Sequence, residues 1–366
     1  MGRNSEGVLM MKSFIAFFFL AYSAHACTTV HLSADDAGGL VVGRTMELGN
    51  AHDLLSRWEL VAHDRGTVKS KLGDNVHGFV SIDVLHNEKS AVTLTDGMNE
   101  HGLTVSVQTF RTAEYQDRKM RDFLHTVTNF ELAKVLLGHA KTVNEVEDLL
   151  QKIRVVGNTS PEEWRCHWAI QDSNGRSIVV EYIKGELVVH DNGDVGVLTN
   201  DPSYEWHLSN LDQYASVAPS QPDASAWSAG SHPSAVGHGL NLMGVPGGFS
   251  PASRFVRCFI LKQHLTYTAP PTTEEEAVAA ITGILNNVHI SKGFVPLLVD
   301  DTKDDSHEIT HWSVLKLPGK AEFWFRSYAD MTWRRVEVGG LEWGTGRTFE
   351  RIKMDDGVGV VDVHLQ

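Results

Sequence analysis

The sequence predicts an α+β fold in which two mostly antiparallel sheets stack face to face and helices cover the outside. Short segments rich in β-branched residues, bounded by turn residues, recur along the chain. Helical patterns fall in groups between the strand groups, and hairpin-like connections indicate antiparallel pairing. The composition near Asn158 is not that of a linker. We therefore expect one layered domain over residues 27–366 rather than two separate α+β domains divided near Asn158.

The first 26 residues have the pattern of a secretory signal peptide. Lys12 precedes the apolar run Phe14–Tyr22, and Ala24-His25-Ala26 gives the small-x-small cleavage pattern. The run is too short to span a membrane, and no later segment approaches about 20 apolar residues. We expect cleavage before Cys27, export to the periplasm or the outside of the cell, and no membrane contact after cleavage.

From Cys27 the chain alternates as a strand through residue 33, and residues 40–47 read as its partner in a hairpin. Arg44 and Glu47 lie near the end of this partner strand, where they can reach back to Cys27. An arginine there would favour the thiolate form of Cys27. A carboxylate there could hold the α-amine that cleavage before Cys27 would expose, or it could orient the arginine. An ordinary cross-strand ion pair between Arg44 and Glu47 is the alternative.

The following elements alternate between the two patterns. We expect strands at 58–63, 78–82, 91–95 and 103–107, with a turn cluster at 96–102 before the last of them. Helices are expected at 123–140 and 143–153, the second with Thr142 as its N-cap.

A second group of strands is expected at 167–170, 177–182, 186–190 and 196–200, followed by a helix at 203–214. Residues 218–248, rich in Ser, Pro, Gly and Ala, read as a long loop of the kind that often forms the wall or lid of a site. Helices at 253–265 and 274–287 and strands at 310–315, 321–326 and 332–338 complete the chain.

The acidic composition, with a formal net charge of −14, argues against nucleic acid or an anionic membrane as partner. There is no internal repeat and no zinc-type spacing of Cys and His, so we expect neither metal nor cofactor. The three cysteines, Cys27, Cys166 and Cys258, leave at least one thiol without an intrachain partner. Cys27 could be a lipidated residue or a disulfide partner, but Ala24 stands where a lipoprotein site usually has Leu.

Cleavage before Cys27 would place a thiol and a free α-amine on one residue. A thiol attacks a carbonyl carbon well only as thiolate and therefore needs a base. The α-amine, whose ordinary pKa is roughly 7.7–8.0, is such a base a few bonds away. The sequence thus predicts a nucleophile and its base at a single position.

Six segments, in order, resemble the cholylglycine hydrolase family, which holds bile salt hydrolases and penicillin V acylases among the N-terminal nucleophile hydrolases. The segments are Cys27-Thr28-Thr29, Gly43–Glu47, Thr95–Leu103, Ile178–Tyr182, Leu198–Pro202 and Ser250–Phe255. The resemblance covers most of the mature chain. It implies a four-layer αββα sandwich and hydrolysis of a linear amide in a small N-acyl substrate.

The resemblance also implies roles for particular residues. Cys27 matches the family's nucleophile, and Arg44 matches the arginine beside the thiol that helps to seat substrate. Glu47 stands where the family has the Asp that engages the α-amine. It is one methylene longer, so that contact must shift or pass through water.

Three further positions match the family's substrate and oxyanion groups. Asn200 matches the asparagine whose side-chain amide helps to form the oxyanion hole, and Arg254 matches a second arginine of the site. Gln108 stands where bile salt hydrolases carry Asn and penicillin V acylases often carry Tyr, and its backbone N–H would complete the hole. Because Gln108 matches neither subgroup, the substrate class stays open.

Several alternatives remain at this level. The enzyme could be an acylase of N-acyl homoserine lactones or of fatty acid amides. From another class, the chain could be a catalytically inactive exported binding protein that uses the same cleft. A papain-type protease is disfavoured because the expected pattern around its cysteine is missing. The family often forms homotetramers, so the resemblance implies a homo-oligomer.

Overall fold

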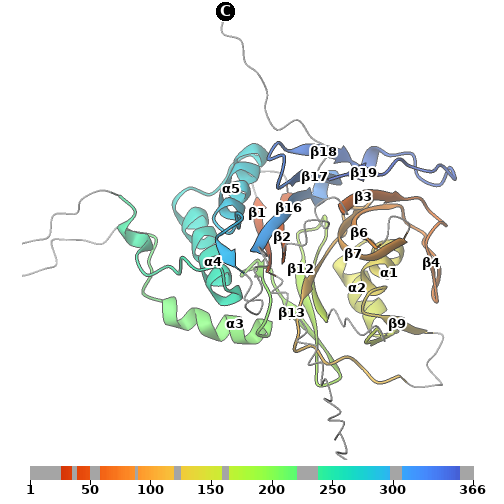
Figure 1. Ribbon diagram of the computed structural model, residues 1–366, viewed down its shortest axis with the longest axis horizontal. Coiled ribbons are helices and arrows are strands. Elements are labelled where there is room, and N and C mark those ends of the chain that lie inside the picture. Colours follow the sequence, from red (N-terminus) through yellow and green to blue (C-terminus); the bar gives the residue numbers. More distant parts are fainter. Residues whose placement is uncertain are drawn as a thin grey trace, which may run out of the picture.

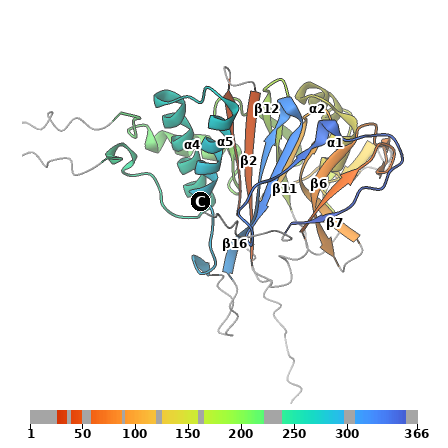
Figure 2. The ribbon, with the colours of Figure 1, turned by 90° about the horizontal axis from the view of Figure 1, so that it is seen from above.

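The structure is a computed structural model that describes residues 26–34, 39–49, 58–86, 90–118, 125–158, 165–220, 238–296 and 307–354. Its centre consists of two large sheets that stand next to each other (Figures 1 and 2). Helices lie on the outer side of each sheet, so the layers run helix, sheet, sheet, helix. The predicted fold class, an α+β sandwich of two mostly antiparallel sheets, is confirmed.

The first sheet contains the N-terminal hairpin at its centre. The strand order is β14-β1-β2-β16-β17-β18, and β15 also pairs with β16. The strands are β1 (Cys27–Ala34), β2 (Gly39–Gly49), β14 (Val197–Leu198), β15 (Val295–Pro296), β16 (His307–Leu317), β17 (Glu322–Ser327) and β18 (Arg334–Glu337). The predicted hairpin is formed, with Cys27 paired with Met46 and Ala34 with Gly39.

The second sheet is built almost entirely from consecutive antiparallel strands, in the order β13-β12-β11-β8-β7-β6-β3-β19. These strands are β3 (Trp58–His63), β6 (Phe79–His86), β7 (Ser90–Asn99), β8 (Thr104–Thr109), β11 (Cys166–Gln171), β12 (Ser177–Ile183), β13 (Glu186–Asp191) and β19 (Ile352–Lys353). Two small pairs complete the described strands: β4 (Lys69–Ser70) with β5 (Gly73–Asp74), and β9 (Thr126–Thr128) with β10 (Arg154–Val156).

Helices cover both outer faces. α1 (Leu132–His139) packs on β7 and β8, with α2 (Val143–Leu150) beside it, whereas α5 (Glu274–Asn286) packs on β1 and β2. α4 (Pro251–Thr268) packs on β1 and β14, and α3 (Tyr204–Leu211) packs on α4. A Cβ on Gly43 of β2 would lie 2.3 Å from the Ile281 side chain, so only glycine permits this approach of α5.

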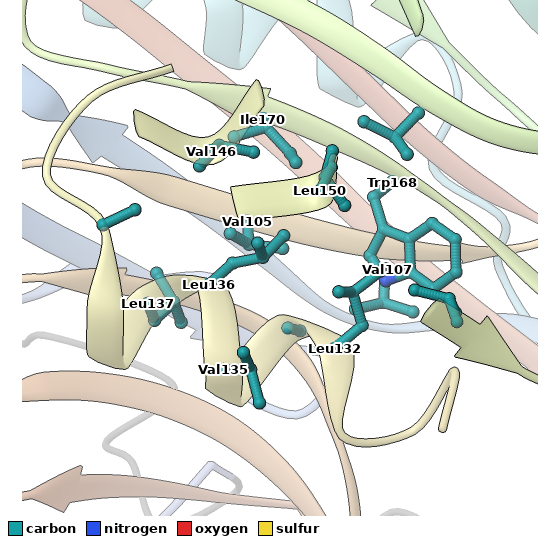
Figure 3. Packing of buried hydrophobic residues seen from close by; sticks show 14 of the residues in the cluster. Val105, Val107, Leu132, Val135, Leu136, Leu137, Val146, Leu150, Trp168 and Ile170 are labelled. Atoms are coloured by element: carbon teal, nitrogen blue, oxygen red, sulfur yellow. The ribbon is translucent and has the colours of Figure 1, made fainter. Parts of the chain in front are cut away.

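Hydrophobic side chains fill the three spaces between the four layers. Under α1 and α2, residues such as Leu136 and Leu150 pack against Val105 and Trp168 of the second sheet (Figure 3). Between the two sheets lies a separate cluster that contains Cys27 together with apolar residues of both sheets. The candidate nucleophile is therefore part of the inter-sheet layer.

Three predicted elements are wrong in extent. Asp96, expected in a turn, lies inside β7, because that strand continues to Asn99 and the reversal follows at Gly102, whose φ is +82°. The helix expected over 123–140 begins only at Leu132, and Thr126–Thr128 is a strand that pairs with β10. α4 begins earlier than predicted because Pro251 occupies its first turn after the Ser250 N-cap.

Other predicted elements are in place, with boundaries that differ by up to four residues, as in β6, which continues to His86. Thr142 caps α2 by accepting the Glu145 N–H, and Thr273 with Glu276 forms a capping box at the start of α5. The signal peptide lies outside the described residues, apart from Ala26, and so does most of the loop at 218–248. In the part of the chain that the structure describes, no helix has the length and apolar character needed to cross a membrane.

Candidate active site

Cys27 is the first residue of β1 and is almost fully buried, with 1% of its surface exposed. Its backbone N–H donates to Asn200 Oδ1 over 2.8 Å, and its thiol lies 3.3 Å from Met46 Sδ. Ala26 is still attached and extends the strand, because its carbonyl accepts the Glu47 N–H at 2.9 Å. The hairpin therefore holds the thiol and the main-chain nitrogen of Cys27 in fixed positions.

Arg44 is the cation beside this thiol. Its Nη2 lies 3.6 Å from Cys27 Sγ and also donates to the Val107 carbonyl, while the guanidinium stacks 4.8 Å from the Trp312 ring. Burial raises the pKa of the Cys27 thiol above its ordinary value, and Arg44 opposes this rise. The buried thiol is therefore protonated near neutral pH and needs a base before it can attack.

A buried network that the sequence did not reveal holds Arg44 in place. Asp96 Oδ2 lies 3.5 Å from Arg44 Nη1 and accepts from the Ser106 hydroxyl at 2.7 Å. Lys316 Nζ contacts both Asp96 oxygens, at 2.9 and 3.1 Å, and also donates to Ser106. Two cations and a hydroxyl thus surround one carboxylate in the space between the sheets.

Asn200 and Arg254 act together on the other side of Cys27. Asn200 Oδ1 accepts from both the Cys27 N–H and Arg254 Nη2, each at 2.8 Å, and Nδ2 donates to the Thr109 carbonyl at 3.0 Å. Arg254 Nη1 also donates to the Cys27 carbonyl and to the Thr28 hydroxyl, both at 2.6 Å. Two donors on the amide oxygen fix the orientation of Asn200, and its second N–H is left for another acceptor.

Residues from three elements support the backbone around Asn200. His167 lies 2.8 Å from the Thr199 carbonyl through Nε2 and 2.9 Å from Glu181 through Nδ1. His207 Nε2 lies 2.9 Å from the Asn200 carbonyl. Burial by itself would raise the pKa of Glu181. The hydrogen bond from His167 acts in the opposite direction, and the pKa is lowered to about 2. Of these three residues, only Glu181 lies in one of the six family segments, and the sequence assigned it no role.

Glu47 does not pair with Arg44, so the ion pair considered as an alternative is not formed. Residues three apart on a strand lie on opposite faces, and the Glu47 carboxylate faces the helices, where Oε1 accepts from the Thr310 hydroxyl at 2.8 Å. Its Oε2 is buried without a hydrogen bond among the described residues. Burial raises the pKa of Glu47 to about 8, and Arg254 opposes this. A contact between this carboxylate and an α-amine remains a prediction.

Gln108 lies on β8 and reaches across to the first sheet. Its side-chain amide is hydrogen-bonded to the Thr29 hydroxyl and faces the carbonyls of Leu198 and Thr199. With Cys27, Gln108 also lines a small cavity of about 10 Å³. The side chain therefore ties the two sheets together next to the thiol, and the role of the Gln108 backbone N–H remains a prediction.

A larger cavity, of about 570 Å³, opens next to the main chain that leads into Cys27. Its lining includes the rings of Phe249 and Phe294, stacked at 5.9 Å, and Asn200, which follows β14 by two residues. The lining side chains that carry a charge are Arg111, Asp201 and Glu308. The site can thus receive an apolar acyl group beside polar and charged groups.

Cys27, Cys166 and Cys258 are all buried, and none of them forms a disulfide. Among the described residues, one group has the spacing of metal ligands, namely His77, Glu100 and His101. In that group, Glu100 already accepts from Arg65 and from the Gly78 N–H.

Comparison with known proteins agrees with this architecture. A sequence model of linear amide C–N hydrolases, choloylglycine hydrolase family, matches residues 27–341. An uncharacterised protein of Paramecium bursaria Chlorella virus 1 is 30% identical over 318 residues, or 85% of this chain and all of the viral protein. A bile salt hydrolase/transferase of Lactiplantibacillus plantarum is 32% identical over 256 residues, or 69% of this chain and 75% of the relative.

Solved structures show the same fold. A variant of the conjugated bile acid hydrolase from Clostridium perfringens superposes with a TM-score of 0.74 at 24% identity, covering 90% of this chain and 98% of that one. The chain therefore has the fold of that bile acid hydrolase, an αββα sandwich. The chain belongs to the choloylglycine hydrolase family of linear amide C–N hydrolases, and its activity is that of an amide hydrolase. The family predicted from the six segments is confirmed.

Proposed function

We propose that the mature protein begins at Cys27 and that the Cys27 thiol hydrolyses the linear amide of a small N-acyl substrate. One observation carries the proposal. Cys27 begins strand β1, its thiol lies 3.6 Å from Arg44 Nη2, and its backbone N–H donates to Asn200 Oδ1. The family match, which starts at the same residue, supports it. The leader before Cys27 would direct the chain out of the cytoplasm.

In the first half of the reaction, the α-amine of Cys27 takes the thiol proton and sulfur attacks the amide carbon. A carbon–sulfur bond forms, and the carbonyl oxygen becomes an oxyanion. The second N–H of Asn200 and the backbone N–H of Gln108 are the proposed donors to this oxyanion. One such donor typically contributes ~10²–10³ in rate. Arg254 positions Asn200 for this task through its bond to Oδ1.

In the second half, the α-ammonium gives its proton to the leaving nitrogen, the carbon–nitrogen bond breaks, and a thioester remains. Water then attacks the thioester while the α-amine accepts a proton from that water. Release of the acid returns the proton to sulfur. Arg44 lowers the cost of negative charge on the buried sulfur at each stage.

The substrate class is open between several amides. The L. plantarum relative is named as a bile salt hydrolase, and a penicillin V acylase of Pectobacterium atrosepticum is 28% identical over 36% of this chain. Conjugated bile salts and phenoxymethylpenicillin are therefore the first substrates to test. N-acyl homoserine lactones and fatty acid amides are the second group. Inactivity toward all of them, relieved by Glu47→Asp with Gln108→Asn, would favour an inactive binding protein.

Mass spectrometry of the secreted protein, followed by amidase assays on Cys27→Ser and Cys27→Ala, tests the proposal. We expect a first residue of Cys27 and a loss of nearly all turnover in both variants, with unchanged circular dichroism. A longer N-terminus on active protein, or full activity of Cys27→Ala, would refute it. Light scattering of the same sample tests the homo-oligomer, a tetramer, that the family resemblance implies.

A further inference from the structure

The main chain of Ala26 fills a place beside Cys27 that must be emptied on maturation. Its carbonyl accepts the Glu47 N–H at 2.9 Å, and its own N–H donates to the Glu308 carboxylate. Ala26 also lines the cavity of about 570 Å³. If the chain is cut before Cys27, this place keeps one free donor, the Glu47 N–H, and one free acceptor, the Glu308 carboxylate.

Glu308 is built into this wall rather than exposed on the surface. It lies on β16 opposite Gly49 of β2, with 3% of its surface exposed. Its Oε1 is buried and has no hydrogen-bond partner among the described residues. A buried carboxylate oxygen without a hydrogen-bond donor costs free energy. A ligand that supplies the missing donor would therefore bind more tightly to the mature site.

The chemistry of amide hydrolysis places the leaving amine in this same region. The α-ammonium of Cys27 must reach the leaving nitrogen, which requires a separation of about 2.6–3.2 Å. Ala26 is bonded to that very nitrogen of Cys27. The substituent on the leaving nitrogen therefore extends beside the α-amine, where Ala26 stands in the uncleaved chain.

We propose that the place vacated by Ala26 is the subsite for the leaving amine, and that Glu308 selects amines bearing a neutral or cationic hydrogen-bond donor. Amines bearing a carboxylate or sulfonate, such as those of conjugated bile salts and phenoxymethylpenicillin, are disfavoured there, so this inference favours the second group of substrates named above. This inference rests on the proposed function, because it needs Cys27 to be the first residue and the nucleophile.

The charges around the subsite support this preference. Burial raises the pKa of Glu308 to about 7, and Arg254 opposes the rise. Arg254 is itself committed to Cys27, Thr28 and Asn200. Arg111 stands in the same cavity and also stabilises the Glu308 carboxylate. Above neutral pH an anionic amine substituent would thus meet an ionised carboxylate at short range, whereas a hydroxyl or ammonium would bond to it.

The test uses decanoyl amides of ethanolamine, ethylenediamine, glycine and taurine with protein that begins at Cys27. Amine release at pH 8 gives kcat/KM for the wild type, for Glu308→Gln and for the control Glu186→Gln, an exposed carboxylate on β13. We expect the wild type and the control to prefer the ethanolamine and ethylenediamine amides at least tenfold. Glu308→Gln should bring the glycine and taurine amides to within about threefold of the ethanolamine amide and slow the ethylenediamine amide about tenfold.

The outcomes are distinguishable. Preference of the wild type for glycine or taurine, or a selectivity that Glu308→Gln leaves unchanged, would overturn the role of Glu308 while leaving the proposed function intact. Absence of cleavage of all four amides and of the earlier panel would overturn both. Product inhibition of the wild type gives a second measurement that needs no variant, and ethylenediamine should inhibit at least tenfold more strongly than glycine. Equal inhibition would also contradict the subsite.

Discussion

Two buried polar clusters meet at Cys27, and they differ in how completely their charges are satisfied. The thiol-side cluster consists of Arg44, Asp96, Ser106 and Lys316, and both oxygens of its carboxylate accept from cations or a hydroxyl. The amine-side cluster comprises two carboxylates, Glu47 and Glu308, with Thr310 and Arg254. There, Glu47 Oε2 and Glu308 Oε1 are buried without a partner among the described residues.

Under the proposed cleavage before Cys27, the thiol side would be complete beforehand, whereas the amine side would be completed only afterwards. On the thiol side, the Asp96 carboxylate and the Val107 carbonyl already hold Arg44 near sulfur in the chain that retains Ala26. The amine side has an excess of acid, and burial raises the pKa of Glu47 to about 8 and of Glu308 to about 7. Removing Ala26 would bring a positive α-ammonium to that side, and substrate would bring a further donor.

The largest effect should come from breaking the complete cluster. Asp96→Asn leaves Arg44 and Lys316 as buried cations without a counter-charge, and breaking a buried pair typically costs about 3–5 kcal/mol. Urea unfolding should show a loss of that size. The control Asp74→Asn removes an exposed pair with Lys69 and should cost less than about 1 kcal/mol. Equal losses in the two variants would show that Asp96 stabilises the fold no more than an exposed ion pair does, and would contradict a tightly satisfied thiol-side cluster.

The incomplete cluster should respond to pH instead. In the chain that retains Ala26, Glu47 titrates at about 8 when folded, against an ordinary value of 4.5. The folded state therefore binds the Glu47 proton more tightly than the unfolded state does. This contribution to stability is fully present below pH 4.5 and is lost as pH rises toward 8. The free energy of unfolding should therefore fall by a few kcal/mol over that window, and Glu47→Gln should flatten the fall.

The groups that face Glu47 are Arg254, Thr45, Thr310 and Glu308, so Glu308 adds to the same trend and its titration ends near pH 7. Glu186→Gln serves as the control with an exposed carboxylate and should follow the parent curve. Parallel curves for Glu47→Gln and the parent would contradict the raised pKa. In protein that begins at Cys27, the α-ammonium should reduce the pH dependence of the parent.

The contrast between the clusters also shows what the sequence could and could not predict. Strand alternation and the hairpin turn placed Arg44 and Glu47 within reach of Cys27, and the family segments added Asn200 and Arg254. Lys316 was not predicted because it is 220 residues from Asp96 in the sequence, and the two residues meet only when the sheets pack together. Asp96 itself was assigned to a turn because Asp-Gly favours reversal locally. The buried pairing in β7 overrides that preference.

Glu308 was missed for a related reason. It lies just before the strand expected at 310–315, and an acid at such a place is ordinarily solvated. Only the pairing of β16 with β2 puts it beside Ala26. His167 and His207 likewise gain their role from the fold, which brings three elements to the backbone of Asn200. Local patterns therefore predicted the strands and the family segments, whereas long-range pairing determines which charges are satisfied.

Alkylation of Cys27 offers a third, smaller test of the comparison. In the chain that retains Ala26, burial raises the pKa of the thiol and Ala26 covers the adjoining cavity. Protein that begins at Cys27 should react with iodoacetamide at pH 7.5 at least tenfold faster, which corresponds to about 1.4 kcal/mol. Cys166 and Cys258 are internal controls, because burial raises the pKa of both and they should stay unmodified. Equal rates at Cys27 would mean that the leader does not shield the site.

The smallest expected effect concerns the hydroxyl that partly satisfies the amine side. Thr310 donates to Glu47 Oε1 at 2.8 Å and accepts the Ile290 N–H at 2.8 Å. Thr310→Val should destabilise the chain that retains Ala26 by about 1 kcal/mol at pH 5. Because the ionised carboxylate then loses the Thr310 hydroxyl as a donor, the loss should grow as pH rises through 8. Thr310→Ser keeps the hydroxyl and should restore the parent's dependence on pH. If valine and serine behave alike, the Thr310 hydroxyl does not stabilise the charge of Glu47, and that role falls to Arg254, Thr45 and the incoming α-ammonium.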